Sequence, residues 1–289
     1  MILVTGGTGQ IGSRLLLNLT KNKAYKVRAI YRNTQSLEKI RQLFVKHSDS
    51  GAAQFDTIEW IQADLSNIPA LEKAFEGVTF VFHCAGLISF QPQDFDKLID
   101  VNVQGTANIV NLSIDFGVKK LCYVSSVATL STLPHTPIDE ENDWNNEDNN
   151  TDYAISKHGA EMEVWRGSQE GLPVVIVNPS VVLGGDFTDR GSGLLYKKVA
   201  DGLRYYPTGA TGFVGVDDVV RAMVQLQFSE VAGERFVLNA ENLTYKAVLE
   251  RIAKQLGVKA PTKRVSHQML RFLARLDVVL SFLHLKKRT

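Results

Sequence analysis

The chain has 289 residues, of which 44% are hydrophobic and 22% charged, as in an ordinary globular protein able to bury a large core. A formal net charge of +1 gives no reason to expect attraction to nucleic acid. The six histidines are scattered and no Cys-x-x-Cys spacing occurs, so no metal site is expected.

Targeting signals are not apparent in the sequence. Residues 1–5 run directly into the first motif, which leaves no room for a signal peptide, and no run of about 18 apolar residues could cross a membrane. Cys84 and Cys122 are expected to be free thiols in a reducing compartment. These features predict a cytoplasmic protein, although the absence of a helix breaker at the end leaves open whether the C-terminus is complete.

The first 180 residues alternate short apolar runs with helical patterns. The expected strands are Ile2–Thr5, Lys26–Arg32, Thr57–Gln62, Thr79–His83, Lys119–Ser125 and Pro173–Asn178. The expected helices are Ile11–Lys21, Gln35–Lys46, Ile68–Glu76, Phe95–Phe116 and Asp152–Glu170. This alternation predicts an α/β fold with a doubly wound parallel sheet and right-handed crossovers.

The pattern changes after Pro179. Residues 184–215 are rich in glycine and are expected to form loops that close over a cleft. The elements expected after them are Asp217–Phe228, Arg235–Leu238, Thr244–Leu256 and His267–His284. We therefore predict a core over residues 1–178 and a smaller substrate lobe over 179–289, with 213–240 returning to the core.

A glycine-rich segment, Thr5–Gly12, follows the first strand and opens the first helix. Gly6 would permit the turn, Gly9 would let backbone approach a pyrophosphate, and Gly12 would let the helix pack on the strand. Free amides at the helix N-terminus would face the phosphates, with Thr8, Gln10 and Ile11 in the same loop. The segment predicts a Rossmann-type NAD(P)-binding core.

The end of the second expected strand carries no acid that could bind a ribose 2′-hydroxyl. Arg32 stands there instead, and its guanidinium could pair with a 2′-phosphate. This favours NADP over NAD.

Tyr153 and Lys157 are four residues apart, so one helix would place both on the same face. The lysine charge is expected to lower the pKa of the phenol from about 10 and to suit it to general acid–base catalysis. Ser126 ends the fifth strand and could hold a substrate carbonyl beside Tyr153, with Ser125 as the competing candidate.

Together these motifs resemble the extended short-chain dehydrogenase/reductase family. The matching segments are Thr5–Gly12, Asp64-Leu65, His83–Gly86, Asn102-Val103, Ser125-Ser126, Tyr153-x-x-x-Lys157 and Asn178-Pro179. The resemblance implies that Asp64 and Leu65 border the adenine, that Ala85 and Gly86 line the cofactor, and that Asn102 supports the active-site helix. It also implies that Lys157 bonds the nicotinamide ribose and that Asn178, Pro179 and Ser180 lie beside the nicotinamide.

Two reactions would use these groups. The first is reduction of a carbonyl, or oxidation of the alcohol, of a small apolar or aromatic substrate; the second is epimerisation or dehydration of a nucleotide sugar with tightly bound NAD(P). Residues 178–184 are similar to the dihydroflavonol-reductase-like and hydroxysteroid-dehydrogenase-like branches, which favours the reductase. Side chains that could line an apolar pocket are Phe90, Trp144, Phe187, Tyr196, Tyr205 and Tyr206, whereas Arg190, Lys197, Lys198 and Arg204 could hold a diphosphate.

A third hypothesis is a cofactor-sensing protein without catalysis, but relatives of that kind often lack the Tyr/Lys pair. The resemblance also implies a homodimer that packs the helices expected at Phe95–Phe116 and Asp152–Glu170 together.

Overall fold

The computed structural model describes residues 1–131, 137–189 and 191–265. The predicted helix His267–His284 and the proposed diphosphate ligand Arg190 lie outside these ranges. The chain forms two compact units. Unit 1 comprises Met1–Val182 and Val214–Leu238, and unit 2 comprises Leu183–Phe213 with the chain from Asn239 onward.

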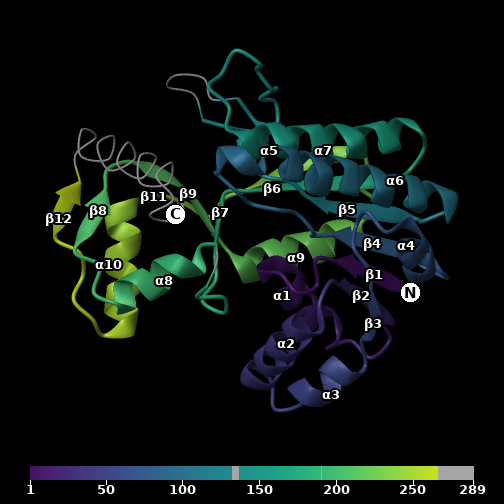
Figure 1. Ribbon diagram of the computed structural model, residues 1–289, viewed down its shortest axis with the longest axis horizontal. Coiled ribbons are helices and arrows are strands. Elements are labelled where there is room, and N and C mark those ends of the chain that lie inside the picture. Colours follow the sequence, from purple (N-terminus) through teal and green to yellow (C-terminus); the bar gives the residue numbers. More distant parts are fainter. Residues whose placement is uncertain (132–136, 190, 266–289) are drawn as a thin grey trace. The chain divides into compact units, whose positions relative to one another are not determined.

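Unit 1 is built on a seven-stranded parallel sheet of order β10-β6-β5-β4-β1-β2-β3 (Figure 1). The strands are β1 Ile2–Thr5, β2 Val27–Tyr31, β3 Glu59–Gln62, β4 Phe80–His83, β5 Lys120–Val124, β6 Val174–Pro179 and β10 Glu234–Leu238. The order reverses direction beside β1, so the predicted doubly wound Rossmann-type sheet is confirmed.

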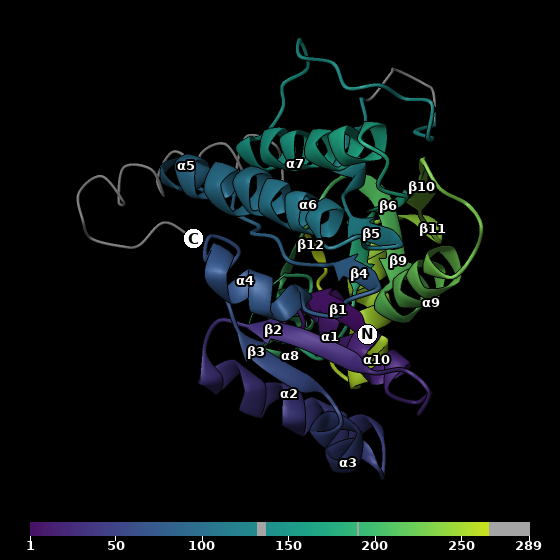
Figure 2. The same cartoon turned by 90° about the vertical axis from the view of Figure 1, so that its right-hand side faces the viewer.

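Helices cover both faces of this sheet: α4, α6 and α7 lie on one face, and α1 and α9 lie together on the other (Figures 1 and 2). The helices of unit 1 are α1 Gln10–Leu19, α2 Thr34–His47, α3 Gly51–Asp56, α4 Ile68–Phe75, α5 Phe95–Leu98, α6 Gly105–Asp115, α7 Asp152–Gln169 and α9 Val216–Gln227. Short 3₁₀ turns occupy Pro92–Asp94 and Val127–Thr129.

The central strands are buried along their whole length, because helices exclude water from both faces. Polar caps set where the helices begin. The hydroxyl of Thr151 accepts from the amide of Ala154 at the start of α7, and the Asn33 side chain accepts from the amide of Ser36 at the start of α2. These caps fix the chain at the points where candidate site residues follow.

The single helix predicted over Phe95–Phe116 is interrupted. A π-helical segment, Ile99–Gln104, separates α5 from α6. Such wide turns insert a residue into the helical repeat and often occur at functional sites. Here the segment contains Asn102, whose side chain is buried.

Unit 2 contains more regular structure than the sequence predicted. The loops expected over 184–215 include helix α8 Gly193–Ala200 and strands β8 Tyr205–Pro207 and β9 Ala210–Gly215. The other elements are β11 Glu241–Thr244, α10 Tyr245–Leu256 and β12 Lys263–Val265, while β7 Val181–Leu183 crosses the unit boundary. β9 pairs antiparallel with β11, and β8 pairs parallel with β12. None of the helices in the described ranges combines the length and the apolar character that crossing a bilayer requires.

Candidate active site

The candidate residues of unit 1 gather at one edge of the sheet. The seven strands are parallel and in register, so their carboxyl ends meet at the same edge. Ligands of open α/β sheets bind at this edge, near the reversal of strand order. The glycine loop, Ser126 and Asn178 all stand at strand ends there.

The glycine loop turns tightly between β1 and α1. Gly6 adopts a φ of +67°, and a Cβ on it would lie 2.6 Å from the backbone nitrogen of Ala85. A Cβ on Gly12 would lie 2.2 Å from the carbonyl oxygen of Gly6. Both glycines are therefore required by the protein's own packing.

Gly9 differs from the other two glycines. A Cβ there would meet only the carbonyl oxygen of Gly6, at 3.2 Å, and no side chain caps α1, whose first turn contains no acid. The helix therefore presents its first amides beside a bare backbone, an arrangement that suits a phosphate. The loop thus fits a dinucleotide, with Thr8, Gln10 and Ile11 half-buried around it.

The second and third strand ends carry exposed polar side chains. Arg32 follows β2 and is exposed, and its carbonyl accepts from the side chain of Gln62 at 3.1 Å. Asp64 follows β3, and its carboxylate accepts from the amide and hydroxyl of Ser66. Leu65 is buried, within 3 Å of where a Cβ on Gly105 would stand, so its side chain packs on α6.

Ser126 and Tyr153 stand on neighbouring elements, the turn after β5 and helix α7. Ser126 caps the short turn after β5, which packs against α7. Tyr153 lies near the start of α7, and the Ser126 hydroxyl is close enough to lower the pKa of its phenol. The competing candidate Ser125 is turned away from the site and donates to Glu161 at 2.5 Å. Ser126 is therefore the serine that reaches the phenol.

Lys157 lies one turn beyond Tyr153 on α7 and is buried. Its Nζ donates to the hydroxyl of Tyr123 at 2.5 Å and to the carbonyl of Val124 at 2.8 Å. The ammonium also stands 4.3 Å from the centroid of the Tyr123 ring. Burial lowers the pKa of Lys157 to about 7, and the carboxylate of Glu161 opposes that shift.

The expectation that Lys157 lowers the pKa of Tyr153 is wrong for this structure. Burial raises the pKa of the Tyr153 phenol, and the hydrogen bond with Ser126 only partly offsets this. The physical reason is the direction of the lysine, which bonds Tyr123 and backbone instead of the phenol. Tyr153 therefore keeps its proton at neutral pH.

A buried polar chain continues from Lys157 towards β1. The imidazole of His83 lies 2.6 Å from the hydroxyl of Thr5 through Nδ1 and 3.0 Å from that of Thr106 through Nε2. Burial raises the pKa of the Tyr123 phenol, and the nearby hydroxyl of Thr106 partly offsets this. Burial lowers the pKa of His83 to about 3, so this imidazole is neutral.

Asn102 joins the segment after β4 to α7. Its amide donates to the hydroxyl of Ser156 at 2.9 Å and to the carbonyl of Leu87 at 3.0 Å, and its oxygen accepts from the amide of Leu87 at 2.7 Å. A Cβ on Gly86 would lie 3.4 Å from that oxygen, and the amide of Ala85 donates to Thr5. These contacts hold the segment after β4 in place.

The polar side chains at the end of β6 form hydrogen bonds with neighbouring segments of the protein. The amide of Asn178 lies within hydrogen-bond distance of the Ser126 carbonyl, the Thr129 hydroxyl and the Glu161 carboxylate. Pro179 is buried at the end of the strand, and the hydroxyl of Ser180 donates to the carbonyl of Leu238 at 3.2 Å.

Three residues without a predicted role also lie at or behind the site: Tyr123, Glu161 and Arg235. The available signal was the spacing of Glu161, four residues after Lys157, which puts a carboxylate on the buried face of α7.

The aromatic side chains proposed for an apolar pocket have different surroundings. Phe90 packs edge-on against Tyr153, with ring centroids 5.8 Å apart, and is 70% exposed. Trp144 stacks on His158 at 4.4 Å. In unit 2, Phe187 is buried, and Lys197, proposed to hold a diphosphate, pairs with Asp201.

The parallel sheet with its reversal of strand order and the glycine loop define a dinucleotide-binding protein. The sequence model of the NAD dependent epimerase/dehydratase family matches residues 2–239. The chain belongs to this family, and it is an NAD(P)-dependent oxidoreductase of the extended short-chain dehydrogenase/reductase type.

Several known proteins are similar over most of the chain. The sterol demethylase protein B of Methylococcus capsulatus is 28% identical, over 99% of this chain and 84% of its own length. A putative dihydroflavonol 4-reductase of Synechocystis is 28% identical, over 91% and 74%. The crystal structure of gox2253 superposes with a TM-score of 0.80 at 27% identity, covering 100% of this chain and 85% of the other. The predicted family and its dihydroflavonol-reductase-like relatives are thus confirmed.

Proposed function

We propose that the protein reduces the carbonyl group of a small apolar or aromatic substrate with NADPH. The observation that carries this proposal is the placement of Tyr153 and Lys157 one turn apart on α7, which packs against the turn capped by Ser126 at the carboxyl edge of the sheet. Burial raises the pKa of the Tyr153 phenol. A phenol that keeps its proton is a general acid, and reduction of a carbonyl requires an acid at the oxygen that becomes an alcohol.

The roles follow from these contacts. Ser126 and Tyr153 would both bond the substrate oxygen, and Tyr153 would give it a proton as negative charge develops. When bound, the cofactor supplies the hydride to the carbonyl carbon. Lys157, one turn beyond Tyr153 on α7, would hold the ribose of the cofactor.

The cofactor would lie along the strand ends. Residues Gly6–Gly12 would hold the pyrophosphate, Asp64 and Leu65 the adenine, and Ala85, Gly86 and Asn178–Ser180 the nicotinamide side, with Asn102 supporting that side through Leu87. Arg32 supports NADP over NAD because its exposed guanidinium stands where NAD-binding relatives often carry an acid.

The substrate would be apolar next to the reacting oxygen. Phe90 contacts the ring of Tyr153 and is 70% exposed, and Ile88, two residues earlier, is 62% exposed. Exposed apolar side chains beside an acid gain free energy when a hydrophobic ligand covers them. We assign the remaining substrate contacts to unit 2, as the substrate lobe.

A screen of carbonyl compounds and nucleotide sugars tests the proposal. Purified protein is incubated with NADPH or NADH, absorbance at the nicotinamide band is followed, and products are identified by mass spectrometry. We expect NADPH consumption with aromatic or apolar carbonyls, lost in Tyr153→Phe while NADPH binding persists. Interconversion of a nucleotide sugar without net cofactor consumption would establish the epimerase instead.

We also propose a homodimer formed through α6 and α7. Ile155 and Met162 lie on α7 and are 38% and 42% exposed, which leaves apolar surface that a second copy could cover. Sedimentation at micromolar concentration should give twice the chain mass, and Met162→Glu should give a monomer. Only monomer in the unchanged protein would contradict this proposal.

We further propose that the protein works in the cytoplasm. Cys84 and Cys122 are both free thiols, and free buried thiols suit a reducing compartment. Fractionation of the source cells would locate it.

A further inference from the structure

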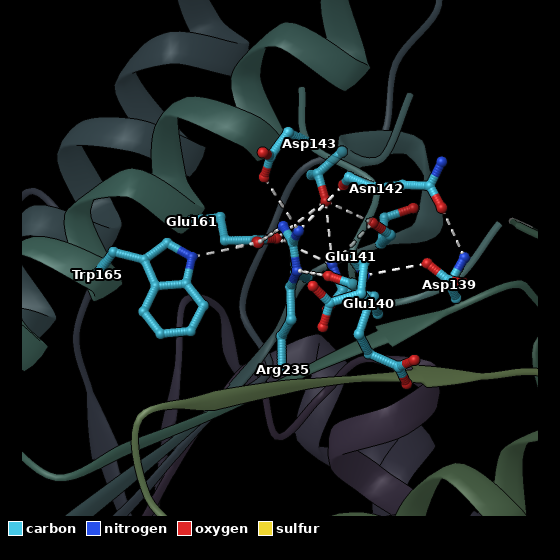
Figure 3. Close-up of polar contacts among 12 residues, drawn as sticks. Asp139, Glu140, Glu141, Asn142, Asp143, Glu161, Trp165 and Arg235 are labelled. Atoms are coloured by element: carbon cyan, nitrogen blue, oxygen red, sulfur yellow. Dashed lines mark hydrogen bonds and ion pairs between the residues drawn. The ribbon is translucent and has the colours of Figure 1, made fainter. Parts of the chain in front are cut away.

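A buried carboxylate lies directly behind Ser126 and Tyr153. Glu161 stands one turn beyond Lys157 on α7, and its side chain is 1% exposed. Its Oε2 accepts from the hydroxyls of Ser125 and Thr129 at 2.5 and 2.9 Å, and from the amide of Asn178 at 2.9 Å. Its Oε1 accepts from Trp165 and Arg235, both at 3.4 Å (Figure 3).

The donors to Oε2 surround the backbone of Ser126. Ser125 precedes it, and the Thr129 hydroxyl, three residues later, lies 2.9 Å from the Ser126 carbonyl as well as from Glu161. Asn178 also donates to the Ser126 carbonyl, at 3.1 Å. One carboxylate thus fixes the turn that carries Ser126 to the helix that carries Tyr153.

Arg235 compensates the buried charge and connects a further segment. From β10 it donates to the carbonyls of Glu140 and Asn142, at 2.9 and 3.0 Å, as well as to Glu161 (Figure 3). These carbonyls belong to residues 139–150, which precede α7. Burying an ion pair costs desolvation free energy that can exceed the attraction between its charges. We therefore assign this pair the role of fixing the arrangement of the segments that it joins, not that of adding net stability.

We propose that Glu161 is a positioning residue that holds the Ser126 hydroxyl against the phenol of Tyr153. The proposal rests on the proposed function, in which these two hydroxyls bond the substrate oxygen. Glu161 itself touches neither substrate nor cofactor in this scheme and acts through Ser125, Thr129 and Asn178.

Glu161→Gln is a sharp test because N–H groups, which can only donate, face both oxygens: Asn178 at Oε2, and Trp165 and Arg235 at Oε1. The hydroxyls of Ser125 and Thr129 could also accept. An amide has one oxygen and one NH₂ group, so whichever way it turns, one side places donor against donor. If the oxygen faces Trp165 and Arg235, the turn around Ser126 loses its acceptor; if it faces the turn, the pair with Arg235 is lost. Size and shape remain almost unchanged.

The position of Ser126 is read from Tyr153 by NMR. With tyrosine labelled at ¹³Cζ, the Tyr153 resonance is identified by its loss in Tyr153→Phe, and Ser126→Ala gives the shift caused by losing the hydroxyl bond. We expect Glu161→Gln to move the resonance in the same direction by at least half as much. The double variant should show no further shift. Glu163→Gln, which removes an acid paired with Arg166 on the same helix, is the matched control and should leave the resonance unchanged.

A second variant keeps the test decisive if Glu161→Gln does not fold. Ser125→Ala removes one donor to the carboxylate with a minimal change in volume, and it should shift the Tyr153 resonance in the same direction. A resonance that stays at its wild-type position in both variants, or in Ser125→Ala alone if the other fails to fold, would overturn the proposal.

Activity gives an independent reading. With phenanthrenequinone as the probe carbonyl and NADPH, Glu161→Gln should lower kcat by about 10- to 100-fold, as misplacement of a reacting group does. The Kd for NADPH should stay within about twofold, and the Ser126→Ala background should abolish the effect. If the wild-type protein reduces no carbonyl, the proposed function fails, but the NMR result still decides the role of Glu161.

Discussion

Replacing Lys157 with methionine removes a buried cation while keeping an unbranched side chain of similar length. In the folded protein burial lowers the pKa of this amine from 10.5 to about 7. Because one pH unit corresponds to about 1.4 kcal/mol, the charged lysine costs the fold about 5 kcal/mol below pH 7. Between pH 7 and pH 10.5 the unfolded chain holds a proton that the folded chain has released, so the cost declines as the pH rises through this window.

Urea unfolding from pH 6 to pH 9.5, with wild type and Lys157→Met compared at each pH, measures this cost. The variant lacks the hydrogen bonds to Tyr123 and Val124 at every pH, which contributes a constant offset. On top of that offset, the stability of wild type relative to the variant should rise by about 3 kcal/mol between pH 7 and pH 9.5. A difference that stays constant across the range would refute the argument that burial controls the charge of Lys157.

Three further predictions concern the loop, the ion pair and the cofactor. Gly12→Ala places a Cβ 2.2 Å from the carbonyl oxygen of Gly6, so calorimetry should find NADPH affinity reduced at least about 10-fold and melting lowered; unchanged affinity would contradict this packing. Arg235→Met leaves the charge of Glu161 unpaired and should cost about 3–5 kcal/mol in urea unfolding, whereas a loss below about 1 kcal/mol would mean that water replaces the guanidinium. Arg32→Gln should reduce the ratio of NADPH to NADH affinity about 10- to 100-fold, and an unchanged ratio would remove Arg32 from the site.

The sheet could be predicted because each strand is recognisable from the apolar character of its own residues. The strands Lys120–Val124 and Val174–Pro179 are mostly apolar because helices bury both of their faces. In the helices, apolar residues recur every three or four positions. The smaller unit has no such signal. β8 is three residues long and pairs with β12, Tyr205 opposite Lys263, so its stability depends on a partner far along the chain that no local pattern reveals.

The candidate site likewise has features that could be predicted from the sequence and features that could not. Ser126, Tyr153 and the glycine loop stand at strand ends and helix starts, which motif order is enough to locate. The direction of Lys157 could not be predicted, because it depends on Tyr123 from a neighbouring strand offering an acceptor closer than the phenol of Tyr153. The π-helical turn at Asn102 has no propensity signature either, and only the contacts with Leu87 and Ser156 explain it.

Tyr153, Lys157 and Glu161 follow one another at intervals of four along the same face of α7, yet each has its own set of partners. Tyr153 bonds Ser126, Lys157 bonds Tyr123 and Val124, and Glu161 pairs with Arg235. Burial lowers the pKa of Lys157 to about 7, and the carboxylate of Glu161, one turn further along α7, raises it against that effect. Removal of the charge at Glu161 should therefore lower the pKa of Lys157 further, so one helix face couples the charge of the amine to the ion pair behind it.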